Sequence, residues 1–135
     1  MKKLLLVFAS LLFTGCGSDN LTTPTRELLT GRWNLTAVEN KSLPYKIVGP
    51  GTREVVADIL ILAADNTFSE STTIRTTLNG TVTEQTVLDS GTYEFNAYAV
   101  TFHFQSNGTF GSGTIIARKM TVVTSGLSFT YEKMQ

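Results

Sequence analysis

From Leu28 onward, the chain alternates between apolar and polar residues and is interrupted at short intervals by turn residues. No window in this part has a sustained 3.6-residue apolar repeat. Alternation with period two is typical of β-strands that bury one face, so helices have little room here. Asn79-Gly80, which lies between two alternating runs, is the strongest hairpin signal in the sequence. We therefore expect an all-β fold built from consecutive antiparallel hairpins.

The turn residues divide this part of the chain into eight expected strands. They span residues 31–40, 55–64, 67–78, 81–95, 98–105, 109–117, 120–124 and 127–134. Short consecutive connections favour an up-and-down meander, and an even number of strands brings the first and last together antiparallel. Closure into a barrel removes the two exposed edges of such a sheet. The sequence predicts an eight-stranded antiparallel up-and-down β-barrel over residues 28–135, with a two-sheet β-sandwich as the alternative.

The expected central hairpin has a testable register. A two-residue turn at Asn79-Gly80 places Arg75 directly opposite Glu84, an opposite-charge pair that suits the solvent face. The same register gathers the aromatic residues of the two strands on the other face. Gly91 is a possible bulge site, and a bulge there would shift the pairing.

The first 16 residues read as a targeting segment. Lys2 and Lys3 precede an almost unbroken apolar run at residues 4–13. This is the organisation of a secretory signal peptide, and the run is too short to span a bilayer core of about 30 Å. The run leads to Gly15-Cys16, and a small residue directly before a cysteine resembles the bacterial lipobox. The alternative is an ordinary signal peptide followed by an incidental cysteine.

The lipobox resemblance implies a signal peptide at residues 1–15 and acylation of Cys16. Residues 16–27 would then be a lipidated N-terminus and flexible tether, because they contain few apolar side chains. Two or three acyl chains would anchor the protein firmly, at roughly 0.8 kcal/mol per buried methylene. We therefore expect a lipid anchor in the bacterial cell envelope, at the periplasmic face of the outer membrane or at the cell surface.

Charge and composition exclude several classes of function. The 11 basic and 11 acidic residues balance, so we expect no nucleic-acid partner. The chain has one cysteine and one histidine, too few for a disulfide framework or a His/Cys metal cluster. His103 is expected to point outward, and Asp58, Asp65 and Asp89 are expected at strand ends and turns. We expect a monomer with no enzymatic activity, cofactor or metal.

Several short motifs resemble a known family. Gly31-Arg32-Trp33 places a Gly-x-Trp motif at the start of the first expected strand. Other motifs are Leu43-Pro44-Tyr45, Asn66-Thr67-Phe68, Gly91-Thr92-Tyr93, Gly108-Thr109-Phe110 and Tyr131-Glu132-Lys133. In this order and spacing, they resemble the lipocalin-like (calycin) domains, and most closely the short bacterial lipocalin-like lipoproteins of unassigned function. The resemblance covers residues 28–134.

The family resemblance implies that Trp33 packs beneath Lys133 and closes one end of the barrel, whereas the residues alone make Trp33 a core side chain. The resemblance also implies that the loop at residues 40–54 is a lid over a ligand cavity at the other end. The alternative is a loop that merely covers apolar surface. An eight-stranded barrel can hold one small ligand or be filled by side chains, and the many aromatic residues of the expected inner face favour filling.

The candidate pocket residues come from the expected inner face and the first loop. They are Tyr45, Ile47, Phe68, Glu70, Ile74, Tyr93, Phe95, Phe102, Phe104 and Tyr131. Leu78 and Val87 fall on the same face by alternation. We expect the barrel to bind a small apolar ligand. The alternative is a protein-binding module, such as a periplasmic inhibitor of proteases or of lysozyme.

Overall fold

The computed structural model describes residues 24–47 and 51–135. The expected signal peptide, Cys16 and most of the expected tether lie outside the described residues.

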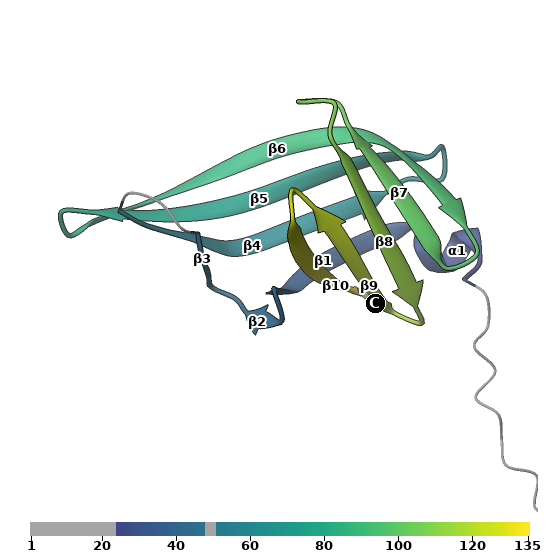
Figure 1. Ribbon diagram of the computed structural model, residues 1–135, viewed down its shortest axis with the longest axis horizontal. Coiled ribbons are helices and arrows are strands. Elements are labelled where there is room, and N and C mark those ends of the chain that lie inside the picture. Colours follow the sequence, from purple (N-terminus) through teal and green to yellow (C-terminus); the bar gives the residue numbers. More distant parts are fainter. Residues whose placement is uncertain (1–23, 48–50) are drawn as a thin grey trace, which may run out of the picture.

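The described chain begins with one helical turn and continues as strands (Figure 1). The helix is α1 (Arg26–Leu29). The strands are β1 (Gly31–Val38), β2 (Lys41–Ser42), β3 (Tyr45–Ile47), β4 (Thr52–Leu62), β5 (Thr67–Leu78), β6 (Thr81–Asn96), β7 (Ala99–Phe104), β8 (Phe110–Ile116), β9 (Lys119–Thr124) and β10 (Leu127–Lys133).

The sheet closes on itself as an eight-stranded antiparallel barrel. Consecutive strands from β4 to β10 are neighbours, β10 pairs with β1, and β1 pairs with β4. This confirms the predicted up-and-down barrel over the sandwich alternative. The two short strands β2 and β3 belong to the first loop and pair with β1 and β4, respectively. They extend the sheet without taking part in the closure.

The register predicted for the β5–β6 hairpin is confirmed. Arg75 pairs with Glu84, and its Nε donates a hydrogen bond of 2.9 Å to Glu84 Oε1. The pairing runs without a shift to Phe68 and Gly91, so there is no bulge between β5 and β6 at Gly91. Instead, a β-carbon at Gly91 would overlap the carbonyl oxygen of His103 on β7 and crowd the ring of Phe68. Glycine is needed there for the close approach of two strands.

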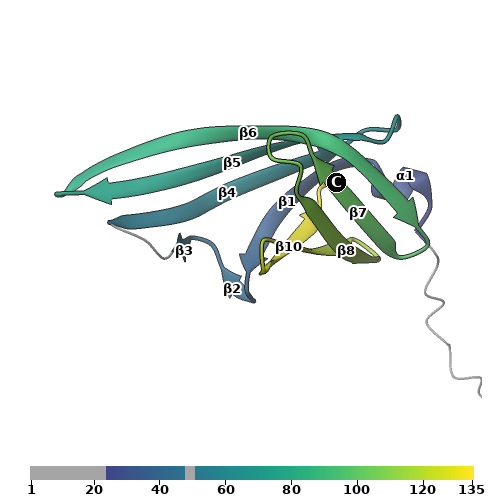
Figure 2. The same cartoon turned by 45° about the horizontal axis from the view of Figure 1, so that its top comes forward.

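The tip of the β5–β6 hairpin extends beyond the barrel. Both strands are longer than their neighbours, and they project past the other strands in Figures 1 and 2. Leu78 is 62% exposed and Val87 is 45% exposed. The prediction that these two side chains face the barrel interior is therefore wrong. Alternation places them on the inner face of the sheet, as the pairing of Val87 with Thr72 shows, but both side chains remain open to solvent.

The N-terminal end of β1 is packed beneath α1. Trp33 is fully buried, and its indole Nε1 donates a 2.8 Å hydrogen bond to the carbonyl oxygen of Leu29. Lys133 Nζ lies 5.9 Å from the centroid of the Trp33 ring and donates hydrogen bonds to the carbonyl oxygens of Glu27 and Leu28. The ammonium therefore ties the C-terminal strand to the last carbonyls of α1. Residues 24–27, expected in the tether, are part of the described structure, and Arg26 Nη1 donates a 2.6 Å hydrogen bond to the carbonyl oxygen of Ala64, just after β4.

Candidate functional site

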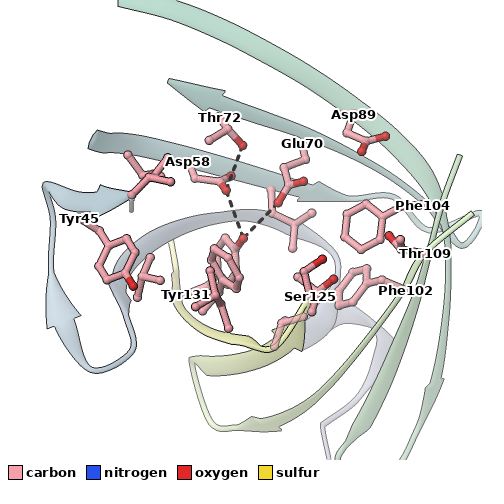
Figure 3. Close-up of a pocket in the computed structure, with 18 of the residues that line it drawn as sticks. Tyr45, Asp58, Glu70, Thr72, Asp89, Phe102, Phe104, Thr109, Ser125 and Tyr131 are labelled. Carbon is pink, nitrogen blue, oxygen red and sulfur yellow. Dashed lines mark hydrogen bonds between the residues drawn. The ribbon is translucent and has the colours of Figure 1, made fainter. Parts of the chain in front are cut away.

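The part of the barrel beneath the first loop contains a cavity of about 590 Å³ (Figure 3). This volume lies within the range of roughly 300 to 1,000 Å³ that is typical of small-molecule sites. Most of the wall is apolar. Its side chains come from the first loop, from the barrel strands and from the turns at residues 106–108 and 125–126. The lining residues are Val38, Tyr45, Ile47, Val55, Asp58, Leu60, Glu70, Thr72, Asp89, Phe102, Phe104, Asn107, Thr109, Val122, Thr124, Ser125, Leu127, Phe129 and Tyr131.

Six of the ten candidate pocket residues line this cavity. They are Tyr45, Ile47, Glu70, Phe102, Phe104 and Tyr131. The structure therefore brings together residues from the first loop and from strands β5, β7 and β10.

The other four candidates lie elsewhere. Phe68 and Tyr93 are buried in the core, where the Phe68 ring meets the ring of Phe102 edge-on at 5.3 Å between centroids. Phe95 packs against the same core, and Ile74 is half-buried on β5 opposite Val55. The aromatic side chains thus fill one part of the barrel, as their number suggested, and leave the part beneath the first loop open.

Two carboxyl groups and two hydroxyl groups meet on the cavity wall. The hydroxyl oxygen of Tyr131 lies 3.1 Å from Glu70 Oε1 and 3.3 Å from Asp58 Oδ2, so its proton can be donated to either carboxyl. Thr72 Oγ1 donates a 3.2 Å hydrogen bond to Asp58 Oδ2. Figure 3 shows the four side chains converging in one group. We call Asp58, Glu70, Thr72 and Tyr131 the acid cluster.

Sheet register explains why the acid cluster forms. Asp58 on β4 pairs with Thr72 on β5, and Leu60 pairs with Glu70. Asp58 and Glu70 are therefore diagonal neighbours on the inner face of adjacent strands. Tyr131 reaches them across the interior from β10.

Burial is the main cause of the raised pKa values of the two carboxyl groups in the acid cluster. Asp58 is only 4% exposed, and loss of water around its carboxyl, together with the nearby charge of Glu70, raises its pKa from 3.8 to about 8. Burial also raises the pKa of Glu70, partly offset by the hydrogen bond from Tyr131. The two carboxyls interact and titrate as a pair, so at neutral pH they share about one proton.

The cavity wall contains acidic side chains and no basic ones among the described residues. Asp89 on β6 adds a third carboxyl to the wall, and none of the described lining residues is a lysine, arginine or histidine. Asp58 Oδ1 is fully buried and accepts no hydrogen bond from any described residue. Buried carboxyl groups with shifted pKa values in a cavity are typical of binding and catalytic sites. This arrangement can bind a positive charge or donate a single proton to a polar group.

The sequence prediction misplaced two of these acids. Asp58 and Asp89 were expected at strand ends or turns, but they lie within β4 and β6. That prediction is wrong for both, whereas Asp65 does lie in the turn after β4, where its Oδ1 accepts a hydrogen bond from Thr67 N. One signal in the sequence could have located Asp58. It is the only charged residue in the apolar run 55–64, and alternation puts it on the same face as Leu60.

The other candidates for chemistry lie away from the cavity. His103 is not among the lining residues, and its ring lies 4.7 Å from that of Phe110, centroid to centroid. Within residues 24–47 and 51–135, no group of three His, Cys, Asp or Glu residues is placed to hold a metal ion.

Comparisons of the chain with protein-family models, with curated proteins and with solved structures give no match.

Proposed function

We propose that this barrel is a non-enzymatic module that binds one small, mainly apolar molecule. The observation that carries the proposal is the cavity of about 590 Å³ inside the barrel, with aromatic and aliphatic walls. A site of this size buries most of a small ligand, and its few polar groups would orient that ligand. One chain forms the whole cavity, so the proposal needs only a monomer.

We propose further that acylated Cys16 anchors the module in the bacterial cell envelope, as in the lipocalin-like lipoproteins it resembles. The support is the lipobox-like Gly15-Cys16 at the end of a short apolar run. None of the helices in the described part of the chain has the length and hydropathy to cross a membrane. In this proposal, the barrel carries or sequesters its ligand near the membrane surface.

The first loop is the proposed lid. Tyr45 and Ile47 line the cavity, and β3 holds them in place by pairing with β4 at Val55 and Arg53. Both side chains are half-buried, so a ligand beneath them would bury more of their apolar surface.

Uptake of the uncharged dye Nile red, followed by fluorescence, tests the binding function. Tyr45→Ala combined with Ile47→Ala should weaken dye binding about tenfold, or about 1.4 kcal/mol, because apolar contacts are lost. The barrel should remain folded, since its own strands and turns are untouched. Phe110→Ala combined with Leu88→Ala is the matched control, because these side chains are 65% and 75% exposed on other strands.

Failure of the unmodified protein to take up the dye would contradict the binding proposal. If the loop variant unfolds in denaturant much more easily than the control, the loop serves as structural cover and the lid proposal fails.

Protein binding is the second candidate, and the projecting β5–β6 hairpin favours it. The hairpin exposes Leu78 and Val82 next to its turn, and Val87 farther along β6. Exposed apolar side chains grouped on one element are typical of contact surfaces for other proteins. This candidate predicts that Leu78→Ser with Val82→Ser abolishes capture of a periplasmic protease or lysozyme and leaves dye uptake unchanged.

A further inference from the structure

We propose that the ligand is an organic cation, with a protonated amine seated against Asp58 and Glu70 and an apolar body filling the rest of the cavity. This inference rests on the proposed binding function and narrows its ligand class. It adds a positive charge to the expected small apolar ligand, and the reason is the charge of the cavity wall.

The ionisable groups of the cavity wall are all acidic. Three carboxyl groups, those of Asp58, Glu70 and Asp89, face the cavity, and the described lining residues include no basic side chain. Charges interact more strongly in a poorly solvated interior than in water. A ligand carboxylate would be repelled by this wall, whereas an ammonium group would be attracted to it.

The carboxyl of Asp58 lacks a hydrogen-bond donor for one of its oxygens among the described residues. Thr72 and Tyr131 both contact Asp58 Oδ2 and fix the orientation of the carboxyl, while Oδ1 is buried without a partner among the described residues. A buried acceptor left without a donor costs free energy. An ammonium group has three donors, so one seated at the acid cluster can bind Asp58 and Glu70 together and offset their charge.

Apolar side chains line the rest of the cavity beside the acid cluster. Phe102 and Phe104 on β7, Val122 on β9, and Leu127 and Phe129 on β10 provide apolar wall for a hydrocarbon or aromatic body. The cavity is far larger than an inorganic ion needs, and no set of three metal-ligating side chains exists in the described chain. The arrangement therefore suits an amine with an apolar tail rather than a metal ion.

The proposal predicts how affinity changes with pH. The groups facing the amine are the carboxyls of Glu70 and Asp89 and the hydroxyls of Thr72 and Tyr131, besides Asp58 itself. An alkyl amine stays protonated up to about pH 10. The pKa of Asp58 is about 8, so the shared proton leaves the acid pair as the pH rises toward that value. Amine affinity should therefore rise from pH 5 to pH 8.

Three probes with the same chain length separate charge from hydrophobicity: decylamine, decanol and decanoate. Each displaces Nile red from the full-length chain carrying Cys16→Ser, in detergent-free buffer at pH 7. We expect decylamine to bind at least about tenfold more tightly than decanol, and decanoate to bind most weakly. The ratio of the decanol to the decylamine dissociation constant is the measured quantity.

Variants locate the amine. Asp58→Asn or Glu70→Gln should reduce that ratio to about threefold or less. Glu132→Gln is the matched control because it removes the same charge from an exposed residue of β10, next to Tyr131 in sequence. Glu132→Gln should leave the ratio unchanged. Glu70→Gln keeps the test informative if Asp58→Asn fails to fold.

The outcomes distinguish the two proposals. If decanol or decanoate displaces the dye as well as decylamine does, or if Glu70→Gln keeps the wild-type ratio, the ligand is not a cation held by the acid pair, and the binding function still stands. If Nile red never enters the unmodified barrel, the binding function fails and this inference fails with it.

Discussion

The carboxyl of Asp58 works against the stability of the folded barrel at neutral pH. It is almost completely removed from water, and its nearest charged neighbour is Glu70, another acid. No cationic side chain of the described cavity wall offsets the loss of hydration. Buried ionisable groups that destabilise the folded state are common at binding and catalytic sites, where their shifted pKa values serve the function.

Stability should fall as the pH rises from 5 to 8. Folding raises the pKa of Asp58 from 3.8 to about 8 and also raises that of Glu70, so the folded state binds more protons than the unfolded chain in this window. The free energy of unfolding should therefore decrease by up to about 1.4 kcal/mol per pH unit for each extra proton. The contribution of Asp58 to stability is therefore greatest below its unfolded pKa of 3.8 and is lost as the pH rises through its folded pKa of about 8. The hydrogen bonds from Thr67 lower the pKa of Asp65, which titrates below this window.

Urea denaturation at several pH values measures this slope. Asp58→Asn should flatten it and should raise the free energy of unfolding at pH 8 by at least about 1.4 kcal/mol, the equivalent of one pKa unit. Glu132→Gln should keep the wild-type slope. A wild-type stability that rises between pH 5 and pH 8 would mean that Asp58 is better hydrated or better paired than the structure indicates.

Alternation in the sequence located some site residues and missed others. It placed Glu70 and Tyr131 on the inner face, and both line the cavity. It could not separate them from Phe68 and Tyr93 on the same faces, because filled and open parts of a barrel have the same strand periodicity. Asp58 was misplaced because an ionisable side chain is rarely buried, although alternation puts it on the same face as Leu60; its pairing with Thr72 on β5 shows that it lies on the inner face.

Among the elements, β6 connects the projecting hairpin to the barrel wall. It pairs with β5 from Thr81 to Thr92 and with β7 from Gly91 to Asn96. Figure 2 shows β6 curving over the molecule between these two parts. At Gly91, the strand comes so close to His103 on β7 that a side chain has no room.

Gly91→Ala should therefore separate β6 from β7. The new methyl group meets backbone atoms of His103, which cannot move aside as a flexible side chain can, so we expect a loss of about 3 kcal/mol. Asp89 lies two residues away on the cavity wall, so dye binding should weaken as well. Urea denaturation and Nile red titration measure the two effects.

Gly80→Ala is the control for this glycine. Gly80 has a φ of +81° and open space around it at the hairpin turn, so alanine should cost only about 1 kcal/mol of backbone strain. Dye binding should be unchanged, because the turn lies outside the cavity lining. Equal losses from both variants would mean that Gly91 acts through its flexibility rather than through the close approach of two strands.

The turn residues predicted the register of the β5–β6 hairpin correctly, but they did not predict which of its side chains are exposed. Asn79-Gly80 set the register, and the Arg75–Glu84 pair follows from it. Exposure of Leu78 could not be predicted in the same way, because it depends on where the opposite side of the barrel ends. That boundary is a property of all eight strands together.

At the scale of the whole molecule, the strand count and short connections were sufficient to predict closure. Eight antiparallel strands in sequence order bring the first, β1, beside the last, β10, and the pairing of Trp33 with Lys133 belongs to that seam. The cavity was not predictable in the same way. The space left inside a barrel depends on strand tilt and on side chains meeting across the interior, neither of which is encoded in local periodicity.

The proposed anchor predicts a defined covalent mass on the whole protein. Wild-type protein extracted from membranes should lack residues 1–15 and carry acyl chains on Cys16, the only cysteine of the sequence. Cys16→Ser should remove both the acyl mass and the cleavage, because no other thiol can take the lipid. Intact-mass spectrometry distinguishes these forms. Wild-type protein without acyl mass would contradict the proposed location and leave the barrel's binding function untouched.

The measurement that tests the central claim most directly is the number of protons released when decylamine binds at pH 7. Calorimetric titration in buffers of different ionisation enthalpy gives this number. If the amine sits against the acid pair, its charge displaces the shared proton, and the unmodified barrel should release about one proton per amine bound. Asp58→Asn should bind with almost no release. Binding by the unmodified barrel with no proton release, or release that persists in Asp58→Asn, would contradict an amine seated at Asp58 and Glu70.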